Sequence, residues 1–414
     1  MCTRLSNSVP AAQESLLGRL MPITQNNPVT DPGELLQAAR QLADRIAQET
    51  DRIDCERELP PDLVGEMAER GLFRLLVPRS LGGSELSCPD FLQIVRTFAR
   101  VDGSTAWCLN QNNVFATASV IMPEKIAGEI WGERRAVVAN GPPTSSVNAV
   151  PVDGGYRLNG TWNFSTGSGH ANWLAALAPI KPANPRQSGL AEGENPRVML
   201  IPKSEATFLE DSWQVSGLRG TGSFSFQVDD LFVPSGRTYD LADPRREDGP
   251  LYVIPRTLLF ASGDATVALS IARSSLITAI ELSQMKSPLR TSNLLQDQST
   301  AQRLIGEGEA ILQSADAFLS QSVSSIWKSA CENQAVSTEE RIQLRLATTF
   351  AIRKAAEVVD ITYNLCGSSA IFASNPIQRQ FQDVRVITQH IQGRLTNYET
   401  AGQFYLGLEP QGSF

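Results

Sequence analysis

The chain has 414 residues, of which 42% are apolar, so it can fold around a substantial core and is not an intrinsically disordered chain. Its formal net charge is −8 and it has no dense run of Lys and Arg, which argues against nucleic acid as a partner.

No segment of the sequence predicts export or insertion into a membrane. The first ten residues lack the apolar core of a signal peptide, and the most apolar stretch, residues 258–282, is interrupted by Asp264 and Arg273. The six cysteines form no CxxC pair, which favours free thiols over a zinc site or a disulfide framework. We therefore expect a cytoplasmic protein without a bound metal or a membrane partner.

The first third of the chain is predicted to be helical. Residues 1–30 are polar and aperiodic, which indicates a flexible N-terminal tail, and residues 31–135 form an N-terminal helical domain. Apolar residues at helical spacing and flanking Pro and Gly predict helices over residues 34–54, 61–71 and 89–101, and a fourth from Ser104, its expected cap.

The pattern then changes twice. Residues 136–243 show short alternating runs, with a turn at Asp153-Gly154-Gly155 and a strand pair over residues 223–233, and predict a central β domain. Residues 244–414 return to helical spacing and predict a C-terminal four-helix bundle. Its long helices are expected over residues 265–285, 297–328, 338–366 and from residue 382 onward.

The stretch YRLNGTWNFSTGSGHANW, residues 156–173, combines a strand pattern with a run of small hydroxyl residues. Ser165, Thr166 and Ser168 alternate with two glycines, and His170 follows. Such a run brings backbone and hydroxyl groups close to a flat polar ligand. The alternative from the residues alone is an ordinary strand and loop.

This stretch and two later ones make the chain resemble the acyl-CoA dehydrogenase superfamily over residues 34–408. Residues 156–173 are similar to its flavin-contact strand, residues 213–234 (WQVSGLRGTGSFSFQVDDLFVP) to the next signature, and residues 376–386 (PIQRQFQDVRV) to the stretch before the last catalytic helix. The resemblance implies an α+β, mostly α fold, and it places Phe164 and Thr166 against the isoalloxazine ring of a flavin.

The position of the catalytic base separates two branches of this superfamily. Where the dehydrogenases commonly have a Glu, this chain has Gln389-His390-Ile391, and Glu399 lies too far along an expected helix to replace it. A late His, GSTAW at residues 103–107 and FSTGSGHANW resemble the two-component flavin-dependent monooxygenases, such as the indole-3-acetate and p-hydroxyphenylacetate hydroxylases.

This resemblance implies the oxygenase component of a two-component enzyme that hydroxylates an indole- or phenol-like aromatic. Reduced FMN or FAD and O2 would form a C4a-hydroperoxyflavin, which requires a held flavin N5 and the exclusion of water. Thr166 and Ser165 are the expected hydroxyls at N5, each able to accept and to donate, and His390 is the expected catalytic imidazole. The alternatives are solvent-facing strand hydroxyls and a core histidine.

Further residues are assigned to the site by the same resemblance. Lys286 and Arg290 lie where this chain departs from the dehydrogenases, and they are candidates to replace the Arg that holds the FAD pyrophosphate there. The expected flavin-binding side chains beside Phe164 and Thr166 are Ser165, His170, Arg219, Lys286, Arg290 and Arg379. The expected substrate pocket contains Trp107, Asn110 and Asn113. The amides of the two asparagines can form hydrogen bonds with a substrate but cannot act as a base. Structural roles remain the alternative for His170 and Trp107, and salt bridges for Arg219 and Arg379.

The partners follow from the same resemblance. No GxGxxG fingerprint follows a predicted strand, so a separate NAD(P)H-dependent reductase is expected to deliver the reduced flavin to a homotetramer. Two alternatives are an acyl-CoA dehydrogenase with FAD and an unrecognised base, and a non-catalytic member that uses the fold for binding or assembly. The site of oxygenation, at C, N or S, is left open.

Overall fold

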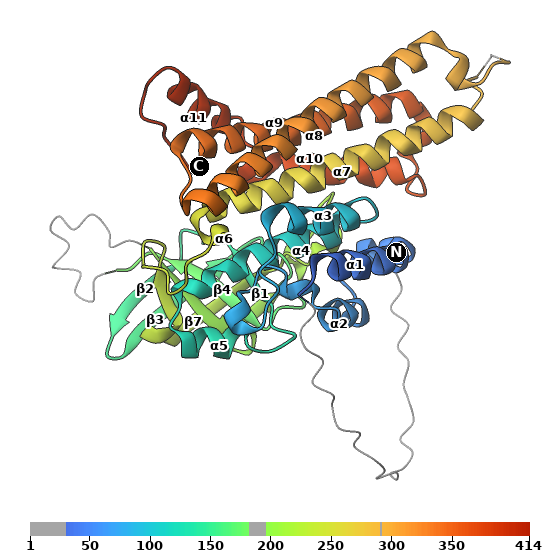
Figure 1. The fold of residues 1–414 in the computed structure, drawn as a ribbon. Helices are drawn as coiled ribbons and strands as arrows, with labels where there is room; N and C mark the ends of the chain where they lie inside the picture. Colours follow the sequence, from blue (N-terminus) through green and yellow to red (C-terminus); the bar gives the residue numbers. More distant parts are fainter. Residues whose placement is uncertain (1–29, 182–195, 290–291) are drawn as a thin grey trace, which may run out of the picture.

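The computed structural model describes residues 30–181, 196–289 and 292–414. The expected tail and Arg290 therefore lie outside the described residues. Figure 1 shows three parts in chain order: the first helices, a β domain beside them, and long helices that lie across both. This order is the one that the sequence predicts.

From residue 30 onward, where the structure describes the chain, the N-terminal part contains five α-helices. They are α1 (Pro32–Glu56), α2 (Pro61–Glu69), α3 (Cys88–Ala99), α4 (Gly103–Ala116) and α5 (Glu124–Trp131). The cap of α4 is Asp102 and not Ser104, because the Asp102 carboxylate accepts the Thr105 N–H at 2.6 Å. Every residue of α4 is buried, since the helix packs against α3, α7 and β1. This helix is therefore central to the protein.

The β domain consists of two four-stranded sheets. The first has the order β1-β4-β5-β8 and the second β2-β3-β7-β6. Their bounds are β1 (Val138–Gly141), β2 (Asn148–Val152), β3 (Gly155–Trp162), β4 (Trp173–Ala178), β5 (Arg197–Pro202), β6 (Thr207–Leu209), β7 (Ser225–Pro234) and β8 (Thr238–Asp240).

The sequence prediction for the β domain is correct for the turn and wrong for the strand pair. Val152 pairs with Gly155 across a tight turn in which Gly154 has φ +76°, a conformation that glycine adopts without strain. Residues 225–234 form the single strand β7, which pairs with β3 and β6 on its two sides. The alternation in this stretch continues without a turn, so it belongs to one strand.

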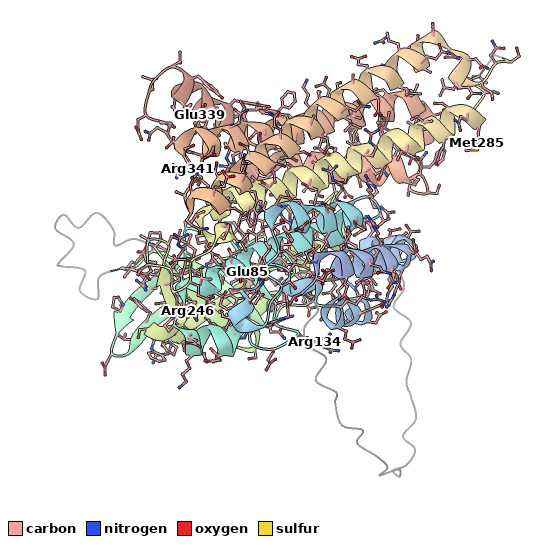
Figure 2. The ribbon with its side chains drawn as sticks, in the orientation of Figure 1. Glu85, Arg134, Arg246, Met285, Glu339 and Arg341 are labelled. Atoms are coloured by element: carbon pink, nitrogen blue, oxygen red, sulfur yellow. The ribbon has the colours of Figure 1, made fainter. Side chains whose placement is uncertain are left out.

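The C-terminal part is a helical bundle. It contains α6 (Pro250–Val253), α7 (Arg256–Met285), α8 (Ser299–Asn333), α9 (Thr338–Cys366), α10 (Pro376–Gln389) and α11 (Thr396–Tyr405). Figure 2 shows Met285 at one end of the bundle and Glu339 and Arg341, at the start of α9, toward the other end. Among the described helices, α7 alone is long and apolar enough to cross a membrane, but 61% of its most apolar window is buried inside the protein. It packs against α3 and α4 of the N-terminal part and against α8, α9 and α10 of the bundle.

The last predicted helix is interrupted. Helix α10 ends at Gln389, His390 is extended with ψ 153°, and a short 3-10 turn precedes α11. The Arg353 guanidinium donates to the Thr388 and Gly393 carbonyls, and the Asn397 amide donates to the Gln392 carbonyl. These side chains satisfy carbonyls that a continuous helix would pair with its own N–H groups. His390 therefore lies at a helix end and not on a helix face.

The cysteines agree with the expectation of free thiols at four positions. Cys88, Cys108 and Cys366 are buried free thiols, and Cys331 is an exposed one. Cys55 is disulfide-bonded, so the expectation is wrong for this residue.

Candidate active site

The predicted hydroxyl loop between β3 and β4 presents an aromatic ring and a buried hydroxyl side by side. Phe164 is 61% exposed, has a left-handed φ of 53°, and meets the edge of Trp213. The Ser165 hydroxyl is fully buried and has no hydrogen-bond partner among the described residues. A Cβ on Gly141 would lie 2.6 Å from that hydroxyl, so the absence of a side chain at Gly141 leaves space for the Ser165 oxygen. An exposed ring and an unpaired buried hydroxyl are typical of a ligand-contact surface.

The second matched signature holds this loop in place. The Thr166 hydroxyl lies 3.0 Å from the Ser223 hydroxyl, which lies 2.8 Å from that of Thr221. The backbone N–H of Gly167 donates to the Thr221 carbonyl at 2.9 Å. Residues 165–168 and 218–224 therefore form one hydrogen-bonded unit.

His170 follows the loop and packs against the N-terminal part as a neutral imidazole. Its Nε2 lies 3.2 Å from Asn112 Oδ1, and its ring packs against Phe73 at 5.4 Å. Burial, with a smaller contribution from the Lys203 ammonium, lowers the pKa of His170 to about 3. The Asn112 amide also donates to the Thr166 carbonyl at 3.3 Å, so Asn112 ties the loop to α4.

A second group of polar residues lies along α4 and α7. Asp264, on α7, is fully buried, and its Oδ1 accepts from the side-chain amides of Asn110 and Gln111, each at 2.9 Å. A Cβ on Gly263 would lie only 1.9 Å from Asn110 Oδ1, so a glycine is required for α4 to come this close. Asp264 thus accepts two hydrogen bonds from α4 although it lies in an otherwise apolar helix.

His390 completes this group from the end of α10. Its Nδ1 lies 3.1 Å from Asp264 Oδ2, the separation of an ion pair, although the contact lacks the alignment of a hydrogen bond. Neither atom has another hydrogen-bond partner in the described parts of the chain. The edge of Trp107 meets the imidazole with ring centroids 5.1 Å apart. The His390 side chain remains 35% exposed, whereas Asp264 behind it is closed to solvent.

Buried Arg345, on α9, adds positive charge near this carboxylate. Its guanidinium donates to Gln392 Oε1 at 2.5 Å and to the Thr257 hydroxyl at 3.0 Å. Burial lowers the pKa of Arg345 to about 10, and the charge of Asp264 opposes that shift, so the guanidinium stays protonated at neutral pH. The arginine therefore places a positive charge near the buried Asp264 carboxylate.

Four other predicted site residues have partners elsewhere. Asn113 accepts from Leu75 N and donates to the Leu72 and Leu109 carbonyls, so it is fully used inside the N-terminal part. Lys286 donates hydrogen bonds to the Cys366 carbonyl and to Ser369. Arg219 forms an ion pair with Asp54. Arg379 forms an ion pair with Asp51 and donates to the Thr50 carbonyl. Arg290 is not described. The Asn113 amide is held by backbone groups of the N-terminal part, and its place in the substrate pocket stays a prediction.

Three residues of the site escaped the sequence prediction. Asp264 was read only as an interruption of an apolar segment, Gln111 was not singled out, and Ser223 was part of a matched signature without a role. A lone carboxylate in a helix that is otherwise apolar on all sides is a signal that could have identified Asp264, because such a charge needs a partner.

Two protein-family models match this chain. The acyl-CoA dehydrogenase N-terminal domain matches residues 32–122, and the acyl-CoA dehydrogenase C-terminal domain matches residues 262–394. Together they cover more than half of the chain and include α4, α7 and His390.

Two curated relatives extend the match to most of the length. The chain is 29% identical over 359 residues to an indole-3-acetate monooxygenase of Pseudomonas putida, with 86% of this chain and 90% of the relative covered. It is 26% identical over 391 residues to the flavin-dependent monooxygenase oxygenase subunit HsaA of Mycobacterium tuberculosis, with 92% and 97% covered.

Solved structures show the same fold. XiaF from Streptomyces, solved with FADH2 and glycerol, superposes with a TM-score of 0.84 at 22% identity, over 92% of this chain and 98% of that one. TdsC from Paenibacillus, solved with FMN and indole, superposes with a TM-score of 0.75 at 22% identity, over 91% and 99%. This chain belongs to the acyl-CoA dehydrogenase superfamily, and the two curated relatives are flavin-dependent monooxygenases.

Proposed function

We propose that the chain is the oxygenase component of a two-component system that hydroxylates a small indole- or phenol-like aromatic. The observation that carries this proposal is the imidazole of His390 backed by buried Asp264, at the position where the dehydrogenases carry a carboxylate base. Helix α4 contacts both this pair, through Trp107, and the hydroxyl loop, through Asn112. One rigid helix thereby positions both halves of the site.

The hydroxyl loop fits a flavin. Phe164 offers an exposed aromatic face for a flat ring, and the unpaired Ser165 hydroxyl offers a buried polar contact beside it. Thr166, in the first matched signature, is 9% exposed, and its hydroxyl contacts Ser223 in the second. The reduced flavin, when bound, supplies the electrons and activates O2, and the loop residues would hold its ring and exclude water.

His390 would act on the aromatic substrate. With Asp264 Oδ2 beside Nδ1, the favoured neutral tautomer carries its proton on Nδ1, which leaves the Nε2 lone pair to accept a proton from a phenol O–H or an indole N–H. Removing that proton makes the ring more electron-rich and hence more reactive toward an electrophilic oxygen. Asp264 itself is fully buried and would stabilise the imidazolium that forms.

The remaining parts of the proposal concern partners and assembly. A separate NAD(P)H-dependent flavin reductase would supply reduced FMN or FAD, and the protein would act in the cytoplasm as a homotetramer. Large apolar side chains are exposed near one end of the bundle, including Met285 at 73%, Leu289 at 88% and Phe372 at 60%, which supports burial of that end between subunits. Arg219, Lys286 and Arg379 are engaged within this chain, so a role for them in flavin binding would require exchange of those contacts.

The experiment that tests this function is a reconstitution with and without a flavin reductase. The purified chain alone should leave NADH unoxidised, and a reductase with FMN or FAD should yield hydroxylated product from indole- or phenol-type substrates under air. If the chain instead binds oxidised FAD tightly and an acyl-CoA bleaches it, the protein is a dehydrogenase and the proposal fails.

A further inference from the structure

The hydroxyl groups behind Thr166 form a chain that leads away from the candidate flavin site. Thr166 Oγ1 lies 3.0 Å from Ser223 Oγ, Ser223 Oγ lies 2.8 Å from Thr221 Oγ1, and Thr221 Oγ1 lies 2.9 Å from the Leu218 carbonyl oxygen. Ser223 and Thr221 are both buried, at 3% and 1% exposure. We name this series, from Thr166 to Leu218, the hydroxyl relay.

The direction of every hydrogen in the relay follows from its last acceptor. A carbonyl oxygen can only accept, so the Thr221 hydroxyl donates its one proton to Leu218. Thr221 must then accept from Ser223, which has no proton left for Thr166, so Thr166 must donate to Ser223. The Thr166 hydroxyl thus has its only proton turned away and presents lone pairs alone to a ligand.

The end of the relay is fixed by the C-terminal bundle. The backbone N–H of Leu218 donates to Asp383 Oδ1, on α10, at 2.6 Å, and Leu218 is held in the left-handed region with φ 50°. A residue other than glycine keeps this strained backbone conformation only where the surrounding structure holds it there. The Thr221 backbone N–H also donates to the Leu218 carbonyl, at 3.2 Å, so this acceptor is locked in position.

We propose that the hydroxyl relay makes Thr166 an obligate hydrogen-bond acceptor and thereby selects the reduced over the oxidised form of the flavin. This inference rests on the proposed function, in which Thr166 contacts the flavin ring. Reduced flavin carries a proton on N5 and can donate it, whereas N5 of oxidised flavin has only a lone pair. An acceptor at Thr166 can receive the N5–H of reduced flavin. With oxidised flavin, the lone pair of Thr166 would face the lone pair of N5, and no hydrogen bond can form.

The relay also separates the roles of the two neighbouring hydroxyls. Ser165 Oγ is fully buried and has no partner in the described chain, so its proton is not committed. Thr166 therefore accepts, and Ser165 is the hydroxyl that can donate to a bound ligand. Ser223 and Thr221 are positioning residues, since they act on the ligand only through Thr166.

The test compares two variants at Thr221, which the relay places two hydroxyls away from the ligand. Thr221→Val removes the hydroxyl but keeps the shape, so Ser223 can donate to Thr166 and Thr166 can turn its proton toward the ligand. Thr221→Ser keeps the hydroxyl and serves as the matched control. The measured quantity is the ratio of dissociation constants for oxidised and reduced FMN and FAD, obtained anaerobically for the wild type and both variants.

The wild type and Thr221→Ser should bind reduced flavin more tightly than oxidised flavin, and Thr221→Val should lower that preference by roughly tenfold, the effect of one mismatched hydrogen bond. A tenfold loss corresponds to a fall of about 30 mV in the midpoint potential of the bound flavin. If Thr221→Val keeps the wild-type ratio, the relay does not set the preference, and the proposed function survives. If the wild type binds neither form of either flavin, both proposals fail.

Discussion

The imidazole Nδ1 of His390 lies 3.1 Å from the Oδ2 of Asp264, and the contact joins the end of α10 to the buried interior of α7. A fully buried carboxylate is costly unless other groups compensate its charge. Two amides from α4 donate to its other oxygen, and buried Arg345 contributes positive charge. The His390 side chain remains 35% exposed, so a ligand can reach the imidazole from solvent.

Replacing His390 with Ala should lower the rate of product formation by roughly 10² to 10⁴-fold, the usual contribution of a general base. The affinity for reduced flavin should stay unchanged, because His390 is not part of the hydroxyl loop. Asp264→Asn should lower the rate on the order of 10²-fold, since the amide neither favours the same tautomer nor stabilises the imidazolium. Product yield by chromatography and flavin binding by titration measure the two effects. Wild-type rates in His390→Ala would remove this residue from catalysis.

Replacing Thr166 with Val should raise the share of reduced flavin that ends as hydrogen peroxide, because the loop no longer holds the flavin through a hydroxyl. Thr166→Ser is the matched control, and it should stay close to the wild type. A peroxide assay run beside product quantification gives the ratio. Equal coupling in the Val and Ser variants would show that the hydroxyl is not needed.

Gly263→Ala should destabilise the protein by about 1–3 kcal/mol, because the added methyl group would overlap the Asn110 side chain, 1.9 Å away. The rate of product formation should fall as well, since Asn110 supports Asp264. Gly306→Ala on α8 is the control: nothing lies within 4 Å of the new methyl group, so stability should rise by up to about 1 kcal/mol. Chemical denaturation measures both. A neutral Gly263→Ala would contradict the close packing of α4 on α7.

Asp383→Asn should change how stability depends on pH. Burial, opposed by the Leu218 hydrogen bond and reinforced by nearby Asp102 and Asp54, raises the pKa of Asp383 to about 7, against about 3.9 in an unfolded chain. Arg379 is the cation that faces the group. Between these two pKa values Asp383 is protonated in the native state but ionised in the unfolded state. The contribution of Asp383 to the free energy of unfolding is therefore fully present below about pH 4.

That contribution is lost as the pH rises through about 7. Asn cannot titrate but can still accept from Leu218, so the variant should gain stability relative to the wild type between pH 5 and pH 8. Denaturant midpoints of the two proteins across that range measure the change. A constant difference between them would show that Asp383 is ionised throughout.

The sequence predicts the fold well because its signals are local. Helical spacing, Pro and Gly boundaries and the alternating β stretch are each read within one segment, and the hydroxyl loop stands out by composition. The Asp264–His390 contact is not local: it depends on how α4, α7 and α10 pack, and no spacing in the sequence relates the two residues. The same holds for the hydroxyl relay, whose last residue, Leu218, donates its backbone N–H to Asp383 from another part of the chain.

Several contacts of the candidate site residues are not predictable from the sequence, and the physical reason is the same for each. Folding supplies a charged or polar residue with partners that a sequence does not show. Lys286 is bound by the Cys366 carbonyl at the end of α9, and Asn113 by backbone groups around Leu72 and Leu75. The break after Gln389 was missed because the side chains that end α10 come from α9 and α11.

The most direct test of the account is a single turnover under ¹⁸O2. The protein is mixed anaerobically with one equivalent of reduced FMN or FAD and an indole- or phenol-type substrate, then exposed to labelled oxygen, and the product is analysed by mass spectrometry. The account predicts one ¹⁸O atom in the hydroxylated product of the wild type and a strongly reduced yield with His390→Ala. Reoxidation of the flavin with all the label in hydrogen peroxide, for every substrate and both flavins, would contradict it.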